Sequence, residues 1–152
     1  MATSDLLKNN WLYIVLCIST YLFGGLFIPG EWYQQLNRAP WSPPDIAFPF
    51  VWTLLYAMIA FAGIKCQQSG DKQLLRLWFI QLFFNATWSW VFFGQHWVLL
   101  GLLNILILLI VVVLFIYRAT CKRDYTLTIL MTPYFIWLSL ATSLNTYIYL
   151  YN

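Results

Sequence analysis

Long apolar runs follow one another along the chain and are separated by short polar breaks. They cover residues at about 10–28, 46–65, 75–94, 97–117 and 126–150. Each run is close to the ~20 residues that an α-helix needs to cross the hydrocarbon core of a bilayer. The pattern therefore predicts an all-α polytopic membrane protein, in which residues 1–152 form a single bundle of five transmembrane helices.

The composition agrees with this pattern and excludes several classes of protein. Hydrophobic residues make up 62% of the chain, aromatic residues 20% and charged residues only 9%. A soluble domain carries roughly 25% charged residues and needs them to cover its surface. Eight basic and five acidic residues are also too few for a surface that follows a phosphate backbone. We therefore expect a lipid bilayer as the environment and no nucleic acid as a partner.

The basic residues are distributed unequally between the breaks. The first loop holds only Arg38, whereas the other basic residues lie in the N-terminal tail and in or directly beside the second and fourth breaks: Lys8, Lys65, Lys72, Arg76, Arg118, Lys122 and Arg123. Loops on the cytoplasmic side of a membrane carry the excess of Lys and Arg. In a bacterial cell membrane, this distribution predicts a cytoplasmic N-terminus and a C-terminus on the far side, together with the first loop.

The first loop, residues 29–45, is unusual because it contains four of the six prolines of the chain. Proline fixes its own φ angle and restricts the residue before it, so the loop is predicted to be stiff. Its side chains Trp32, Tyr33, Leu36 and Trp41 are apolar and need a surface to pack on. Long loops with such anchors often act as lids. The alternative is an aromatic belt at the level of the lipid headgroups.

The ionisable residues offer little conventional chemistry. We expect no acid or base at membrane depth, where proton-coupled transporters and acid–base enzymes need them. Cys17, Cys66 and Cys121 are far apart, and the only histidine, His96, lies in a short break, so no metal site is predicted. We interpret His96 as an interfacial residue rather than a haem ligand.

The third run carries amide and aromatic side chains at helical spacing. They recur every three or four residues and share one face: Trp78, Gln81, Asn85, Trp88 and Phe92. An amide in hydrocarbon needs a partner, and Asn104 and Asn145 in the later runs are further candidates. These amides either hydrogen-bond across helices to hold the bundle together or face a ligand.

Two other runs combine large rings with small residues on one face. In the second run these are Trp52, Tyr56, Ala60 and Gly63, and in the fifth they are Tyr134, Trp137, Ala141, Asn145 and Ile148. Rings supply flat walls and small residues leave room, so the two faces can line a slot for a planar apolar molecule. Ordinary close packing of helices explains the same pattern. Gly24, Gly25 and Gly101 are other places where helices can approach closely.

Several motifs together resemble one known family. They are Trp32-Tyr33, Pro40-Trp41-Ser42-Pro43-Pro44, Val51-Trp52-x-x-Leu55-Tyr56, Gln81-Leu82-x-x-Asn85-x-x-Trp88-Ser89, and Pro133-Tyr134-x-x-Trp137-x-x-x-Ala141-Thr142-x-Leu144-Asn145. The chain resembles the tryptophan-rich sensory protein family, which is also called the translocator protein or peripheral benzodiazepine receptor family. The resemblance extends over almost the whole chain.

This resemblance implies a five-helix bundle, commonly a homodimer, with a ligand pocket beneath the first loop. It implies binding of porphyrins such as protoporphyrin IX or haem as ligands, with no required cofactor. The implied pocket is lined by Trp32, Tyr33, Pro43, Trp52, Tyr56, Asn85, Trp88, Trp137 and Ala141. Trp52 and Asn85 are its expected polar contacts.

Three functions remain open at this point. The first is a membrane-embedded binding protein for tetrapyrroles that acts as sensor, carrier or regulator, with Arg38 meeting a ligand carboxylate at the mouth. The second is an enzyme that degrades porphyrin in light, with Trp137 as its photochemically active residue and no acid–base pair. The third is a structural membrane subunit in which polar side chains such as Asn104 and Asn145 only join helices.

Overall fold

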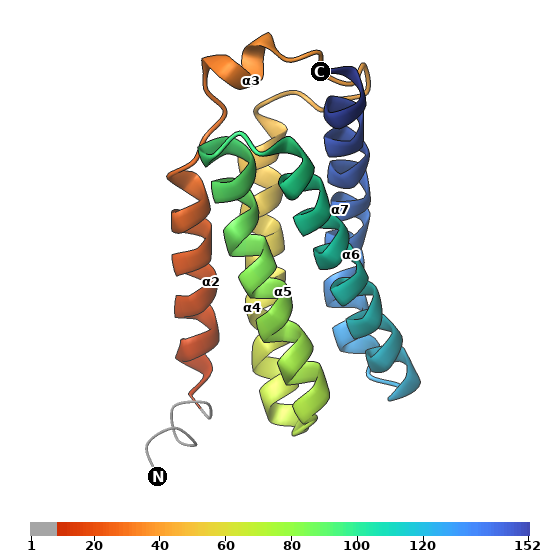
Figure 1. The fold of residues 1–152 in the computed structure, drawn as a ribbon. Coiled ribbons are helices and arrows are strands. Elements are labelled where there is room, and N and C mark those ends of the chain that lie inside the picture. The colour runs from red at the N-terminus through yellow and green to blue at the C-terminus, as the bar shows by residue number, and fades with distance from the viewer. Residues whose placement is uncertain (1–8) are drawn as a thin grey trace.

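A computed structural model describes residues 9–152, and every regular element within that range is helical. Figure 1 shows the longer helices side by side, with a loop across one end of the bundle. The elements are α2 (Asn10–Gly25), α3 (Glu31–Gln35), α4 (Ala47–Ser69), α5 (Lys72–Ser89), the π-helix η1 (Trp90–Gly94), α6 (Val98–Cys121) and α7 (Tyr125–Tyr151).

Polar residues in the predicted breaks set the starts of several helices. The side chain of Asn9 accepts a hydrogen bond from the Trp11 amide, and Asp71 accepts two at the start of α5. Asp124 accepts from the amide of Leu127 at the start of α7. Such caps satisfy backbone donors that have no partner within the helix. At the end of α4, Gly70 has a φ angle of +68°, which a glycine adopts without strain.

Within the bundle, α5 contacts α2, α4 and α6, while α4 also contacts α2 and α7. Tyr13, Gly63 and Trp78 lie at the junction of α2, α4 and α5. The rings of Tyr13 and Trp78 meet edge to face with their centroids 5.2 Å apart. The Trp78 indole also donates to the carbonyl of Ile59 across 2.8 Å. A large buried ring therefore locks three helices together.

The predicted number of five spans is not confirmed by the helices themselves. In the part of the chain that the structure describes, three helices are long and apolar enough to cross a membrane: α4, α6 and α7. The helix α2 is apolar but shorter, and ends at Gly25 rather than at residue 28. The span expected at 75–94 is divided into α5 and η1, and the loop contains the additional helix α3. Within residues 9–152 the structure therefore has six α-helices and one π-helix, where five helices were predicted.

The outer face of α6 shows why the bundle needs an apolar environment. Leu100, Leu103, Ile107, Ile110 and Leu114 are all exposed along this helix. Exposing such a continuous apolar surface to water would cost free energy, whereas lipid chains cover it without this cost.

The first loop is attached to the end of α7. Trp41 donates from its indole nitrogen to the Ser143 hydroxyl across 3.1 Å. The Asn152 side chain accepts from the Asn37 amide at 2.7 Å and donates to the Asn37 carbonyl at 3.2 Å. Ala39 is only 5% exposed. The loop therefore lies over the bundle as a docked segment.

The two ends of the bundle differ in charge. The α4–α5 and α6–α7 turns lie at the end where α2 begins, opposite the first loop and the C-terminus (Figure 1). At this end Arg118 forms two hydrogen bonds with Asp71, at 2.8 and 3.1 Å. Lys65, Lys72 and Lys122 belong to the same end, whereas Lys8 lies outside the described residues.

The glycines expected at close approaches behave differently from one another. A Cβ atom at Gly101 would lie 2.8 Å from the ring of Phe92, so this glycine packs within the chain. A Cβ at Gly24 would lie 3.4 Å from the Ser89 hydroxyl, and one at Gly25 would meet nothing within 4 Å. Of the three, Gly101 is the site where a side chain has no space.

Candidate functional site

Asn85 forms the polar centre of the predicted site. It lies in α5, is 6% exposed, and accepts a hydrogen bond from the Tyr56 hydroxyl of α4 at 2.7 Å. Its side-chain nitrogen donates to the hydroxyl of Tyr134 in α7 at 2.5 Å. One amide therefore connects three helices, so part of its role is to hold the bundle together. Tyr134 was not among the lining residues that the family resemblance implied, although the sequence pattern placed it on the same helix face as Trp137.

Tyr56 and Tyr134, which bond this amide, belong to a group of aromatic rings on α4 and α7. The centroid of Trp52 lies 5.8 Å from that of Tyr56, 6.2 Å from Tyr134 and 6.5 Å from Trp137. Phe48, another residue absent from the prediction, meets Trp137 edge to face at 5.4 Å. The structure thus brings together four predicted residues: Trp52, Tyr56, Asn85 and Trp137.

A second group of rings lies where the first loop meets the end of α5. Trp88 stacks on Phe92 with centroids 5.3 Å apart and 9° between the ring planes. Trp32 meets the edge of Phe92 at 5.7 Å, and Tyr33 meets Phe93 at 5.3 Å. Phe92 therefore links the predicted residues Trp32, Tyr33 and Trp88. In the sequence, helical spacing had already placed Phe92 on the same face as Asn85.

The π-helix η1 positions this second group. Its wider turns are shown by hydrogen bonds from the Gln95 amide to the Trp90 carbonyl and from the Trp97 amide to the Val91 carbonyl. Single π-turns change the register of a helix face and are frequent at functional sites. Just beyond η1, His96 has a φ angle of +58° and stacks on Trp32 with centroids 4.1 Å apart. The interfacial histidine thus contacts the loop.

Several side-chain atoms of this region are buried without a hydrogen-bond partner. Within residues 9–152 they are Gln81 Nε2 and Oε1, Trp88 Nε1, Asn104 Oδ1, Trp137 Nε1, Thr142 Oγ1 and Asn145 Oδ1. A buried polar atom without a partner costs free energy, and most such atoms in native proteins are paired. Five of the candidate residues named from the sequence therefore carry unused hydrogen-bonding capacity: Gln81, Trp88, Asn104, Trp137 and Asn145.

The side-chain nitrogens of Asn104 and Asn145 form different kinds of hydrogen bond. Asn104 donates to the Thr87 hydroxyl of α5 across 2.9 Å, which joins α6 to α5. Asn145 donates to the carbonyl of Ala141 in its own helix at 3.0 Å. The nitrogen of Asn104 thus joins two helices, whereas that of Asn145 stays within one. Ala141 itself is buried, one turn after Trp137.

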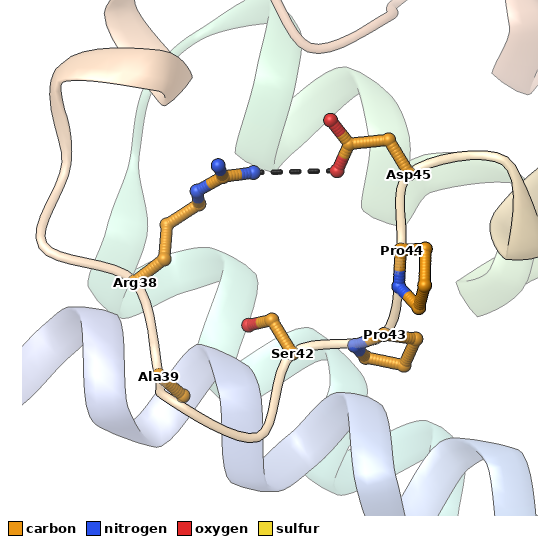
Figure 2. Close-up of a pocket in the computed structure, with 6 residues that line it drawn as sticks. All are labelled: Arg38, Ala39, Ser42, Pro43, Pro44 and Asp45. Carbon is orange, nitrogen blue, oxygen red and sulfur yellow. Dashed lines mark hydrogen bonds and ion pairs between the residues drawn. The ribbon is translucent and has the colours of Figure 1, made fainter.

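Pro43 and Arg38 line an open pocket of about 490 Å³ in the first loop. Figure 2 shows Arg38 and Asp45 facing each other across this pocket, with Ala39, Ser42, Pro43 and Pro44 along its wall. The Arg38 guanidinium lies 3.3 Å from Asp45 and 5.6 Å from the centre of the Tyr33 ring. Burial raises the pKa of the Tyr33 hydroxyl, and the charge of Arg38 offsets part of this rise.

A second pocket of about 270 Å³ opens between α2 and α4. Its wall includes Cys17, Tyr21, Thr53, Tyr56 and Ala60, and Tyr21 and Thr53 share a hydrogen bond of 3.1 Å. The pocket is mostly apolar and reaches Tyr56, which also bonds Asn85. Among the described residues, no group of three or more His, Cys, Asp or Glu is placed to hold a metal ion.

These features define a multi-pass membrane protein with an all-α fold, whose aromatic side chains gather around a buried amide beneath a docked loop. Residues 13–150 match the TspO/MBR family. The chain belongs to this family.

Individual relatives agree with this assignment. The chain is 34% identical over 134 residues to a tryptophan-rich sensory protein of Cereibacter sphaeroides, which covers 88% of this chain and 84% of that protein. It is 37% identical over 142 residues to a tryptophan-rich protein TspO of Chlorobaculum tepidum, with 88% and 89% covered. The human translocator protein is 30% identical over 138 residues, with 80% and 77% covered.

Proposed function

We propose that this protein is a membrane-embedded binding protein for porphyrins, such as protoporphyrin IX or haem, and for related planar apolar molecules. In this proposal it acts as a sensor, carrier or regulator, and its five spans are α2, α4, α5 with η1, α6 and α7. Family membership supports a membrane sensory role. The choice of ligand rests on the chemistry of the aromatic region.

One observation carries the proposal: the indole nitrogens of Trp88 and Trp137 are buried and have no hydrogen-bond partner. Both belong to rings that contact other rings, namely Phe92 and Trp52. A flat apolar ligand with a few polar edge atoms suits both the rings and the unpaired nitrogens. Its faces stack on the rings, and its edge atoms accept hydrogen bonds from the indole N–H groups.

Entry of such a ligand requires a change in the contacts of the first loop. Trp32 and Tyr33 contact Phe92 and Phe93, so the rings at this end of the bundle pack on one another. A disc enters between them only when these contacts separate. The loop therefore acts as a lid whose opening precedes binding.

Quenching of tryptophan fluorescence by added protoporphyrin IX tests the proposal. We expect saturable quenching, and Trp88→Phe and Trp137→Phe should each weaken binding by roughly fivefold, the equivalent of about 1 kcal/mol for one hydrogen bond. Trp11→Phe is the matched control because Trp11 is 69% exposed on α2. Quenching that does not saturate would favour the third function, a structural membrane subunit.

A light-dependent porphyrin-degrading enzyme is the second candidate function. The contact between Trp137 and Trp52, with ring planes at 90°, favours it because the two rings can share the radical cation that forms when Trp137 donates an electron to the light-excited porphyrin. The porphyrin returns this electron to the tryptophans as dioxygen oxidises it, so the protein is unchanged at the end of the cycle. Light and dioxygen would supply the oxidation. Illumination of purified protein with protoporphyrin IX should then bleach the porphyrin faster than in detergent alone. If Trp137→Phe bleaches it equally fast, Trp137 has no photochemical role.

We also propose that the end containing Arg118 and Cys121 faces the cytoplasm of a bacterial cell, which gives a cytoplasmic N-terminus. The excess of basic residues at this end supports the orientation. Cys121 is an exposed natural thiol. A membrane-impermeant maleimide should label it only after the cells are permeabilised, and labelling in intact cells would reverse the orientation. A homodimer is proposed from the family resemblance, and chemical crosslinking in membranes tests it.

A further inference from the structure

The pocket in the first loop contains a pair of opposite charges on the two arms of the loop. Arg38 and Asp45 are separated by Pro40, Pro43 and Pro44, and the Nη1 atom of Arg38 lies 3.3 Å from the Oδ1 atom of Asp45. Figure 2 shows the two side chains pointing toward each other across the open space. The pair therefore lies where a ligand passing the loop would meet it.

The two partners are held very differently. Arg38 follows Asn37, whose amide and carbonyl are both bonded to the Asn152 side chain, and precedes Ala39, which is 5% exposed. Its guanidinium also lies over the ring of Tyr33. The Asp45 side chain is 84% exposed, compared with 38% for Arg38. Arg38 is thus the fixed partner, and Asp45 is the partner that can leave.

We propose that Arg38 is a carboxylate receptor at the mouth and that Asp45 occupies it in competition with the ligand. This inference rests on the proposed function, since it concerns how a porphyrin carboxylate is selected. The fork of the guanidinium suits a carboxylate, and the contact with Tyr33 places it beside the aromatic region. An anionic ligand replaces Asp45 on Arg38, whereas an uncharged ligand of the same shape leaves the pair intact.

The arrangement makes Asp45 a specificity-determining residue. An exposed ion pair is weak, so its release is a small barrier that a ligand carboxylate can overcome. A ligand without a carboxylate gains nothing at Arg38. Removing the charge of Asp45 should therefore favour acids over their esters, and removing the charge of Arg38 should abolish the difference between them.

Protoporphyrin IX and its dimethyl ester are the probes, because they share a ring and differ in two carboxylates. Affinities for both are measured by fluorescence quenching with the full chain in the same detergent. Asp45→Asn should raise the affinity for the acid by roughly two- to fivefold and leave that for the ester unchanged. Arg38→Gln should weaken binding of the acid until acid and ester are equal. Raised salt should reduce the preference of wild type for the acid.

Glu31→Gln is the matched control, because Glu31 is an exposed acid in α3 of the same loop and its loss changes the net charge equally. If Glu31→Gln strengthens binding of the acid as much as Asp45→Asn does, the effect comes from the net charge of the protein rather than from the pair with Arg38, and the proposal is overturned. Equal binding of acid and ester in all variants also overturns it, while leaving porphyrin binding itself intact. If neither probe binds wild type saturably, the proposed function fails and this inference fails with it.

Discussion

The side-chain nitrogen of Asn85 donates to the hydroxyl of Tyr134 across 2.5 Å, which joins α5 to α7 inside the bundle. The oxygen of the same amide accepts from Tyr56 in α4. Asn85 therefore stabilises the contact of three helices and, in the proposed function, also lies beside the ligand. A substitution of Asn85 therefore changes the stability of the bundle and, in the proposed function, the affinity for the ligand. The two quantities must be measured separately.

We expect Asn85→Leu to lower the free energy of unfolding by about 1–3 kcal/mol, because it removes two hydrogen bonds and leaves the buried Tyr134 hydroxyl and the hydroxyl of the partly buried Tyr56 without that partner. Tyr134→Phe removes only one of the bonds and should cost less. Thermal unfolding in a single detergent measures both. The connecting role of Asn85 is wrong if Asn85→Leu unfolds at the wild-type temperature, or if Tyr134→Phe is the more damaging change.

The sequence predicts the face on which Asn85 lies, because helical spacing alone places Trp78, Asn85 and Phe92 together, and all three are buried. It cannot identify Tyr134 as a partner. That contact depends on how α5 and α7 are rotated against each other, which side-chain packing over the whole bundle determines. The π-turns of η1 were missed for a related reason, since an apolar run has the same composition in either type of helix.

The residues predicted to line the ligand pocket lie in separate groups. Helical spacing and the family motifs led to Trp52 and Trp137, whose rings lie next to each other. Pro43, in contrast, lines the open pocket of the loop. The course of a proline-rich loop depends on its tertiary attachments, such as the one between Trp41 and Ser143, and these join residues too far apart in sequence for any local pattern to reveal.

The attachment of the first loop to α7 leads to a second prediction. Asn152→Ala removes the bonds to both backbone groups of Asn37, so the loop should open more often. We expect amide hydrogens in residues 29–45 to exchange several times faster, as measured by mass spectrometry. Trp41→Phe keeps a ring next to Tyr147 but loses the bond to Ser143, and should give a smaller increase.

Two further comparisons make this prediction specific. Ser143→Ala removes the same bond as Trp41→Phe from the other side, and the two variants should give similar exchange in the loop. Exchange in α4 should stay at the wild-type rate in all three variants. If Asn152→Ala accelerates exchange throughout the protein, Asn152 stabilises the whole fold, and the description of a separately attached lid is wrong.

A third prediction concerns acid stability. Partial burial would raise the pKa of Asp71, but its bonds to Arg118 and to the amides of Leu74 and Gln73 lower it below the ordinary value of 3.8. A lowered folded-state pKa adds stability above the unfolded-state value, and this stability is lost as the pH falls through the folded-state pKa. We therefore expect the melting temperature to fall as the pH drops below about 4.

Asp71→Asn isolates the charge, since asparagine is also a good N-cap and can still accept from the start of α5. This variant should melt at a lower temperature than wild type at pH 7 and should lose less stability between pH 7 and pH 3. Asp124→Asn, which changes another N-cap acid at the same end of the bundle, serves as the comparison. If the melting temperatures of wild type and Asp71→Asn fall equally between pH 7 and pH 3, the pair with Arg118 contributes nothing to acid stability.

The last prediction tests the packing at Gly63. A Cβ atom there would lie 2.6 Å from the ring of Trp78 and 2.7 Å from that of Tyr13, and the Trp78 indole is fixed by its bond to the Ile59 carbonyl. Gly63→Ala should therefore destabilise the protein by about 1–3 kcal/mol, as overpacking of a buried site does. Gly25→Ala is the matched control, because a Cβ there meets nothing within 4 Å and alanine favours the helix. It should leave the melting temperature unchanged or raise it slightly. Equal melting temperatures for the two variants would show that α2, α4 and α5 do not meet as tightly at this glycine as the two rings indicate.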